Sequence, residues 1–185
     1  MREYTYAYGA VCPQDGAACY LILPAMDGVC MNVFLQELSE RYADYFLLIV
    51  YDGAPCHSPG VLDIPGNMMV AKLPPQSPNL NPKENGWDDM REKFFHNLVF
   101  DSMNAVEERL VIACNFYESH PEIIHSITAW DWIITDLYIY NWYKFTFPLP
   151  LFAGCCCELC GFQPVSVIIS NVARMRPSPP AKWCI

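Results

Sequence analysis

The amino-acid sequence predicts an α/β fold in which helices flank a mixed β-sheet. Three observations predict it: tyrosines that alternate with smaller residues near the N-terminus, an unbroken apolar run at residues 45–51, and helical periodicity from about residue 81 to 120. The 185 residues, of which 53% are hydrophobic, suffice for one domain with a sizeable core.

The first elements read as a β-hairpin. Residues 3–11 place Tyr4, Tyr6 and Tyr8 at every second position, the period of a half-buried strand with its aromatic side chains on one face. Residues 13–16 have the composition of a turn, and residues 18–23 read as the returning strand. We therefore expect an antiparallel pair at the start of the sheet.

An amphipathic helix and a central strand follow the hairpin. Met31, Leu38 and Tyr42 keep helical spacing, and residues 45–51 are then continuously apolar, as expected for a strand covered on both faces. Asp52 comes directly after this run, at the strand end where open α/β sheets place their ligands. Residues 68–73 predict the next strand.

The second half of the domain is predicted to be helical. Asn81 and Pro82 mark a helix start that puts Glu84 in the first turn, and an apolar stripe follows at Trp87, Met90, Phe94 and Leu98. Another helix is expected from about Ser102 to His120, with a short helix at 121–128.

Residues 134–185 differ in character from the preceding chain. They are apolar and aromatic without clean periodicity, carry a cysteine cluster at 155–160 and end in a proline-rich stretch. The sequence predicts an irregular C-terminal tail, explained by translation past the usual stop or by a frame change. A zinc site at Cys157 and Cys160 is the alternative, but a tetrahedral site needs four ligands and no second ligand pair supports it.

Charge and cysteine usage limit the possible functions. The 20 acidic and 11 basic residues give a net charge of −9, which argues against a free-standing nucleic-acid binder, so any grip on DNA must be local or supplied by a partner. The ten cysteines are scattered through apolar segments without a secretory leader, and no stretch reads as a membrane span. We therefore expect a cytoplasmic chain without a membrane partner.

Two segments carry the functional signal. The first is Tyr51-Asp52-Gly53-Ala54-Pro55-Cys56-His57, and the second runs from Leu73 to Trp87 and contains Asn81-Pro82-Lys83-Glu84-Asn85-Gly86. In the identity, order and spacing of their residues, these segments resemble the catalytic domain of bacterial insertion-sequence transposases related to mariner, members of the DDE superfamily. The resemblance covers about residues 2–133.

This resemblance implies an RNase H-like core at residues 1–133, followed by a tail at 134–185 that is foreign to the family. It implies that three carboxylates hold two Mg²⁺ (or Mn²⁺) ions, which cut one DNA strand and join its 3′ hydroxyl to a target. Asp52 and Glu84 match the second and third catalytic acids and are the predicted metal ligands. Transposon-end and target DNA are the implied partners.

The family's first acid lies on a strand that precedes the hairpin. We therefore expect an N-terminally truncated core that lacks its first strand and is inactive alone. The expected protein partner is a second copy of the chain or an upstream transposase half. A catalytically inactive remnant that binds or inhibits an intact transposase, and a different RNase H-like nuclease, are alternative functions.

Each site residue also has a purely structural interpretation. Asp52 can cap the turn that follows its strand, and Glu84 can cap its helix and stabilise the helix dipole. His57 is a possible auxiliary residue near the scissile phosphate or an ordinary residue beside a turn. Asn85 is a possible partner of a metal ligand or part of a solvated first helical turn.

Overall fold

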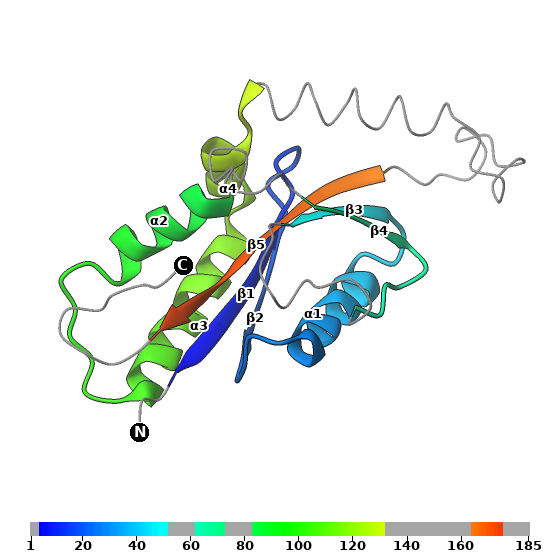
Figure 1. Ribbon diagram of the computed structural model, residues 1–185. Helices are drawn as coiled ribbons and strands as arrows, with labels where there is room; N and C mark the ends of the chain where they lie inside the picture. The colour runs from blue at the N-terminus through cyan, green and yellow to red at the C-terminus, as the bar shows by residue number, and fades with distance from the viewer. Residues whose placement is uncertain (1–3, 52–61, 73–82, 132–163, 176–185) are drawn as a thin grey trace, which may run out of the picture.

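The computed structural model describes residues 4–51, 62–72 and 83–131, and the backbone of 164–175. These residues form one five-stranded mixed sheet of order β2-β1-β5-β3-β4 together with four helices (Figure 1). The predicted mixed sheet flanked by helices is therefore confirmed. The elements are β1 (Thr5–Val11), β2 (Ala18–Leu23), α1 (Gly28–Arg41), β3 (Phe46–Tyr51), β4 (Met68–Lys72), α2 (Lys83–Phe94), α3 (Met103–Ser119), α4 (Pro121–Thr128) and β5 (Pro164–Met175).

The hairpin forms as predicted, but β1 is more deeply buried than expected. β1 and β2 pair antiparallel, with Tyr8 opposite Leu21, and the Asp15 carboxylate accepts a hydrogen bond from the Ala17 amide in the turn. Ala7 and Tyr8 point to opposite faces, yet both are buried. The half-buried strand is thus a wrong expectation, because helices cover both faces of β1.

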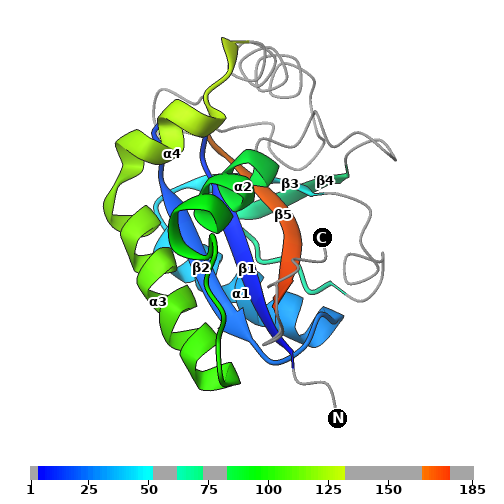
Figure 2. The same cartoon turned by 90° about the vertical axis from the view of Figure 1, so that its left-hand side faces the viewer.

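The helices form two layers around the sheet. Figure 2 shows α2 and α3 in front of the sheet and α1 behind it. On the α1 side, Phe34 and Leu38 pack with Tyr8 of β1 and Ile49 of β3. The cluster on the other side joins β1 and β2 to α2, α3 and α4 through buried side chains that include Ala7, Val11, Tyr20, Trp87, Met90, Leu110, Tyr117 and Ile124.

β5 corrects the expectation of an irregular tail over residues 164–175. It lies between β1 and β3, antiparallel to β1 and parallel to β3. Its sequence from Val165 to Ile169 is rich in β-branched residues, and strands in the middle of a sheet are typically continuous apolar runs. The missing alternation that predicted irregular structure is therefore the pattern of a central strand.

The exposed edge of β2 is closed by a carboxylate from α3. Glu118 accepts a hydrogen bond from the Tyr20 amide at 2.7 Å, and its second oxygen lies 3.0 Å from Arg41 Nη1 at the end of α1. An unpaired strand edge is a site for unwanted pairing with other chains. Glu118 thus satisfies a backbone donor at this edge and links the two helical layers around it.

The helix boundaries follow local signals. α3 begins next to Ser102, as the sequence predicts, and Ser102 caps it by accepting a hydrogen bond from the Ala105 amide. α2 ends at Phe94 rather than at Leu98, and Asn97 adopts a left-handed conformation with φ of 56° that does not continue a helix. Within the described ranges, no helix is both long and apolar enough to cross a membrane.

Candidate functional site

Glu84 lies in the first turn of α2, as the sequence predicts, and is half-buried. α2 is anchored on the sheet by Trp87 and Met90, which are both buried. Next to Glu84, the Asn85 side-chain amide donates a hydrogen bond of 3.5 Å to the Ile127 carbonyl oxygen in α4. The carboxylate therefore sits on a helix with fixed contacts to both the sheet and a neighbouring helix.

Lys83, the first residue of α2, is fully buried. Its Nζ donates a hydrogen bond of 2.5 Å to the Tyr20 hydroxyl and lies 3.8 Å from the centre of the Tyr20 ring and 4.2 Å from that of Trp87. Ammonium groups over aromatic faces gain cation–π attraction. Lys83 is thus an internal anchor that holds the start of α2 against the sheet.

A glycine on β1 makes room for this lysine. A Cβ atom on Gly9 would lie 2.7 Å from Lys83 Cε and 2.9 Å from Tyr20 Cε1, closer than non-bonded atoms tolerate. Burial lowers the pKa of Lys83 to about 7, against weaker opposing effects of surrounding groups, Cys114 and Glu84 first among them. A glycine inside a strand often marks such a close approach, and this is the signal in the sequence that could have located the buried lysine.

Two contacts fix the rest of α2 on α3. The Tyr117 hydroxyl donates a 2.5 Å hydrogen bond to Asp89, and Arg109 Nε donates one of 2.8 Å to the Phe94 carbonyl oxygen at the end of α2. Sequence reasoning missed both positioning residues, because each reads as an ordinary member of an amphipathic helix. Together with Lys83 they hold both ends of the helix that carries Glu84.

The described basic side chains of α2 are buried or paired with carboxylates. Lys83 is buried in the core. Arg91 pairs with Asp88, and Lys93 Nζ lies 2.8 Å from Asp89, so each of these charges is balanced within α2. Phosphate contacts need uncompensated positive charge, which this helix does not supply.

The other predicted site residues, Asp52 and His57, lie outside the described residues, so their roles stay predictions. β3 ends at Tyr51, which is buried. In the described part of the chain, no three His, Cys, Asp or Glu side chains gather into a metal-binding group. Glu84 supplies a hard oxygen donor of the kind that Mg²⁺ prefers.

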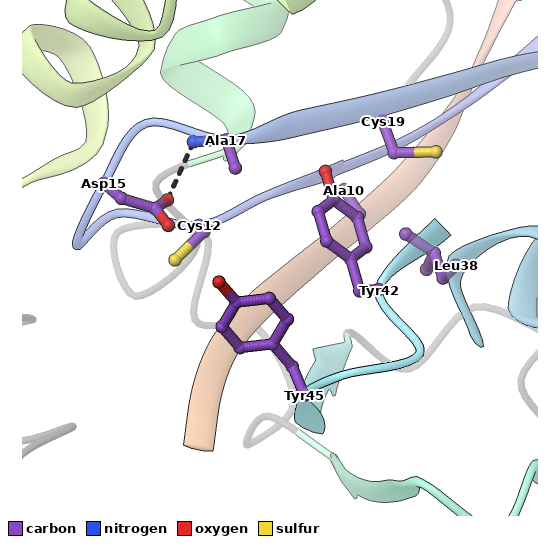
Figure 3. Close-up of a pocket in the computed structure, with 8 residues that line it drawn as sticks. All are labelled: Ala10, Cys12, Asp15, Ala17, Cys19, Leu38, Tyr42 and Tyr45. Atoms are coloured by element: carbon purple, nitrogen blue, oxygen red, sulfur yellow. Dashed lines mark hydrogen bonds between the residues drawn. The ribbon is translucent and has the colours of Figure 1, made fainter. Parts of the chain in front are cut away.

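A small cavity lies on the opposite face of the sheet, towards α1 (Figure 3). Burial, and next the nearby Asp15, raises the pKa of the Cys12 thiol in its wall to about 12. Its volume of about 60 Å³ holds a few waters at most, so it is not the site of a nucleotide or a DNA strand. Its walls are Ala10, Cys12, Asp15, Ala17, Cys19, Leu38, Tyr42 and Tyr45.

Comparison with known families decides the class of the protein. The family described as DDE superfamily endonuclease matches residues 2–107, more than half of the chain and both motif segments. The chain belongs to this family. The DDE match starts before β1 and ends within α3, so it includes Glu84 and all of α2. The predicted resemblance is thereby confirmed at the level of the DDE superfamily.

A curated relative matches most of this DDE chain. The uncharacterized protein y4pE/y4sA of Sinorhizobium fredii (strain NBRC 101917 / NGR234) is 33% identical over 130 residues, which are 70% of the present chain and 96% of the relative. No solved structure matches the chain significantly.

Proposed function

We propose that this chain is the catalytic-domain part of a DNA transposase of the insertion-sequence type, with an RNase H-like core at residues 1–133. Membership of the DDE superfamily endonuclease family carries the proposal, because the matched range includes both the Asp52 segment and the Glu84 segment. The mixed sheet, with a parallel β3–β4 pair beside an antiparallel hairpin, is compatible with that core.

In this proposal Asp52 and Glu84 hold a divalent cation, Mg²⁺ or Mn²⁺. The ion would polarise the scissile phosphate and lower the pKa of an attacking water or hydroxyl. Glu84 supports this role by its place at the N-terminus of α2, where the helix dipole favours a negative charge. The anchors at Lys83 and Tyr117 support it by restricting how far this carboxylate can move.

The auxiliary residues have more limited proposed roles. The Asn85 amide nitrogen donates a hydrogen bond to the Ile127 carbonyl oxygen, so its proposed role is to position α2 beside Glu84. His57 remains a proposed neighbour of the scissile phosphate. A grip on DNA is proposed to come from a partner, either a second copy or an upstream transposase half, because α2 has no uncompensated positive charge.

A second candidate function is that of a catalytically inactive partner of an intact transposase. One observation favours it: β5, which fills the centre of the sheet beside β3, contains neither Asp nor Glu. This central strand therefore supplies no carboxylate to complete a catalytic triad. We therefore propose that the chain alone does not cleave the ends of its own element. A different RNase H-like nuclease is the third alternative, and cleavage of DNA without such ends would favour it.

Calorimetric titration with Mg²⁺ and Mn²⁺ tests the proposed metal site. Glu84→Gln and Asp52→Asn should each weaken Mn²⁺ binding by about tenfold or more, equivalent to about 1.4 kcal/mol. Glu92→Gln is the matched control, because Glu92 lies on the same helix with an exposed side chain. Equal affinities in the wild type and in Glu84→Gln would refute the assignment of Glu84. Nicking of supercoiled DNA carrying the element's ends, followed on a gel, tests cleavage separately.

A further inference from the structure

The centre of the sheet is filled by a strand that comes from far along the chain. Within the described chain β1 and β3 share no hydrogen-bonded ladder, and β5 is the strand that joins them. Figure 1 shows β5 in orange and red between the blue β1 and the cyan β3. Residues 132–163, which separate β5 from the helices, lie outside the described residues.

β5 forms a hydrogen-bonded ladder along each of its two edges. Val11 to Gly9 pair with Ile168 to Ser170, and the ladder resumes with Ala7 opposite Ala173 after an irregularity. On the other side all of β3 is in register, from Phe46 opposite Pro164 to Tyr51 opposite Ile169. Neighbouring strands lie about 4.8 Å apart, so β1 and β3 bound a slot about 9.6 Å wide that fits one strand.

On the α1 face, the two edges of this slot share one hydrophobic cluster. On the α1 face, Phe34 is fully buried in a cluster that contains Tyr8 of β1 as well as Leu47 and Ile49 of β3. This cluster joins β1 and β3 across the slot. The polarity of the edges then determines which strand can enter, antiparallel to β1 and parallel to β3.

We propose that the space between β1 and β3 is a strand-binding site whose ligand is an extended β-branched segment, supplied in this chain by residues 164–175. The site selects by polarity, because the entering strand must run antiparallel to β1 and parallel to β3. The β1 edge is also sterically restricted at Gly9, where Lys83 and Tyr20 leave no room for a Cβ atom.

Hydrogen exchange of the unmodified full chain, followed by mass spectrometry, tests the site directly. Peptides from β5, β1 and β3 should all exchange about 100-fold more slowly, or slower still, than the exposed bend at Asp101, because buried ladders open rarely. Rapid exchange of residues 164–175 in the unmodified chain would overturn the proposal by itself. This experiment does not depend on metal binding or DNA cleavage, so its outcome is separate from that of the proposed function.

A variant and a peptide test whether the strand can be exchanged. Ile169→Pro removes a backbone donor in the middle of β5 and should raise the exchange rate of β1 and β3, whereas Asp101→Pro should not. A synthetic peptide of residues 164–175, added to the Ile169→Pro chain, should restore protection in β1 and β3. A scrambled peptide of the same composition should restore nothing.

The variant experiment has a defined contrary result. Unchanged exchange of β1 and β3 in Ile169→Pro would show that β5 does not hold the slot. If Ile169→Pro also loses its helical circular dichroism, recovery of that signal with the 164–175 peptide still supports the proposal, and equal recovery with the scrambled peptide contradicts it.

Discussion

Replacement of Lys83 by methionine tests whether the lysine is buried without its charge at alkaline pH. Methionine keeps a long unbranched side chain but cannot titrate. The pKa of Lys83 lies at about 7 in the folded chain, below its ordinary value of 10.5, because burial disfavours the ammonium ion. The unfolded chain therefore takes up this proton below pH 10.5, and the folded chain takes it up only below about pH 7.

The sign and size of the effect follow from this difference. Between pH 7 and 10.5 the unfolded state binds more protons, so the free energy of unfolding rises with pH, by at most about 1.4 kcal/mol per pH unit. From pH 7 to 9.5 the expected rise is about 3 kcal/mol. Below pH 7 both states are protonated, and the contribution of Lys83 stays constant.

Lys83→Met should remove this dependence. At pH 7 the variant is relieved of about 4 kcal/mol of desolvation cost and loses about 1–2 kcal/mol with the hydrogen bond to the Tyr20 hydroxyl. It should therefore be more stable than the wild type at pH 7 by about 2–3 kcal/mol. The advantage should vanish towards pH 9.5.

Urea unfolding at several pH values from 6 to 9.5, with EDTA to remove metal ions from Glu84, measures this difference. Lys93→Met is the control, since Lys93 is exposed and paired only on the surface of α2. Buried thiols also titrate towards alkaline pH, but they are common to all variants and cancel in the comparison. Parallel stability curves for the wild type and Lys83→Met would refute the burial of a neutral lysine.

Three other tests give separate outcomes. Gly9→Ala should cost about 1–3 kcal/mol in urea unfolding because its Cβ meets the buried lysine; an unchanged midpoint would contradict this. Glu118→Ala should lower the free energy of unfolding by about 1–3 kcal/mol, because it leaves the Tyr20 amide of β2 without its acceptor. Glu118→Gln keeps an acceptor oxygen and loses only the ion pair with Arg41, so it should cost less than about 1 kcal/mol. Equal costs for the two variants would show that only the ion pair matters. Burial raises the pKa of Cys114 to about 12, so iodoacetamide at pH 8 should modify this thiol about 100-fold more slowly in the native chain than in urea. Because the unfolded chain loses the thiol proton at lower pH than the folded chain, the free energy of unfolding contributed by Cys114 should decline above pH 9.

Local patterns in the sequence were sufficient for most of the helices and strands. The hairpin, the apolar strand ending at Tyr51 and the helix start near Ser102 each depend on residues within a few positions of one another, and the structure has all three. Glu84 was placed correctly in a first helical turn for the same reason. Its role as a metal ligand depends on groups distant in sequence and stays a prediction.

Two features could not be predicted from local pattern. Lys83 reads as a solvated charge in a first helical turn, and its burial depends on the space above Gly9, more than 70 positions earlier. β5 reads as an aperiodic apolar stretch, and its place in the sheet depends on edges offered by β1 and β3, more than 110 positions earlier. Both depend on long-range contacts, which a local period does not encode.

These two features meet at one point of the sheet. The backbone of Gly9 pairs with that of Ser170 in β5, and the Lys83 side chain lies against Gly9. The first turn of α2, and with it Glu84, is therefore supported at the boundary between β1 and β5. A Cβ atom added at Gly9 would press on Lys83 and displace the start of α2. The position of the candidate catalytic acid thus depends on the close approach of Lys83 to this glycine.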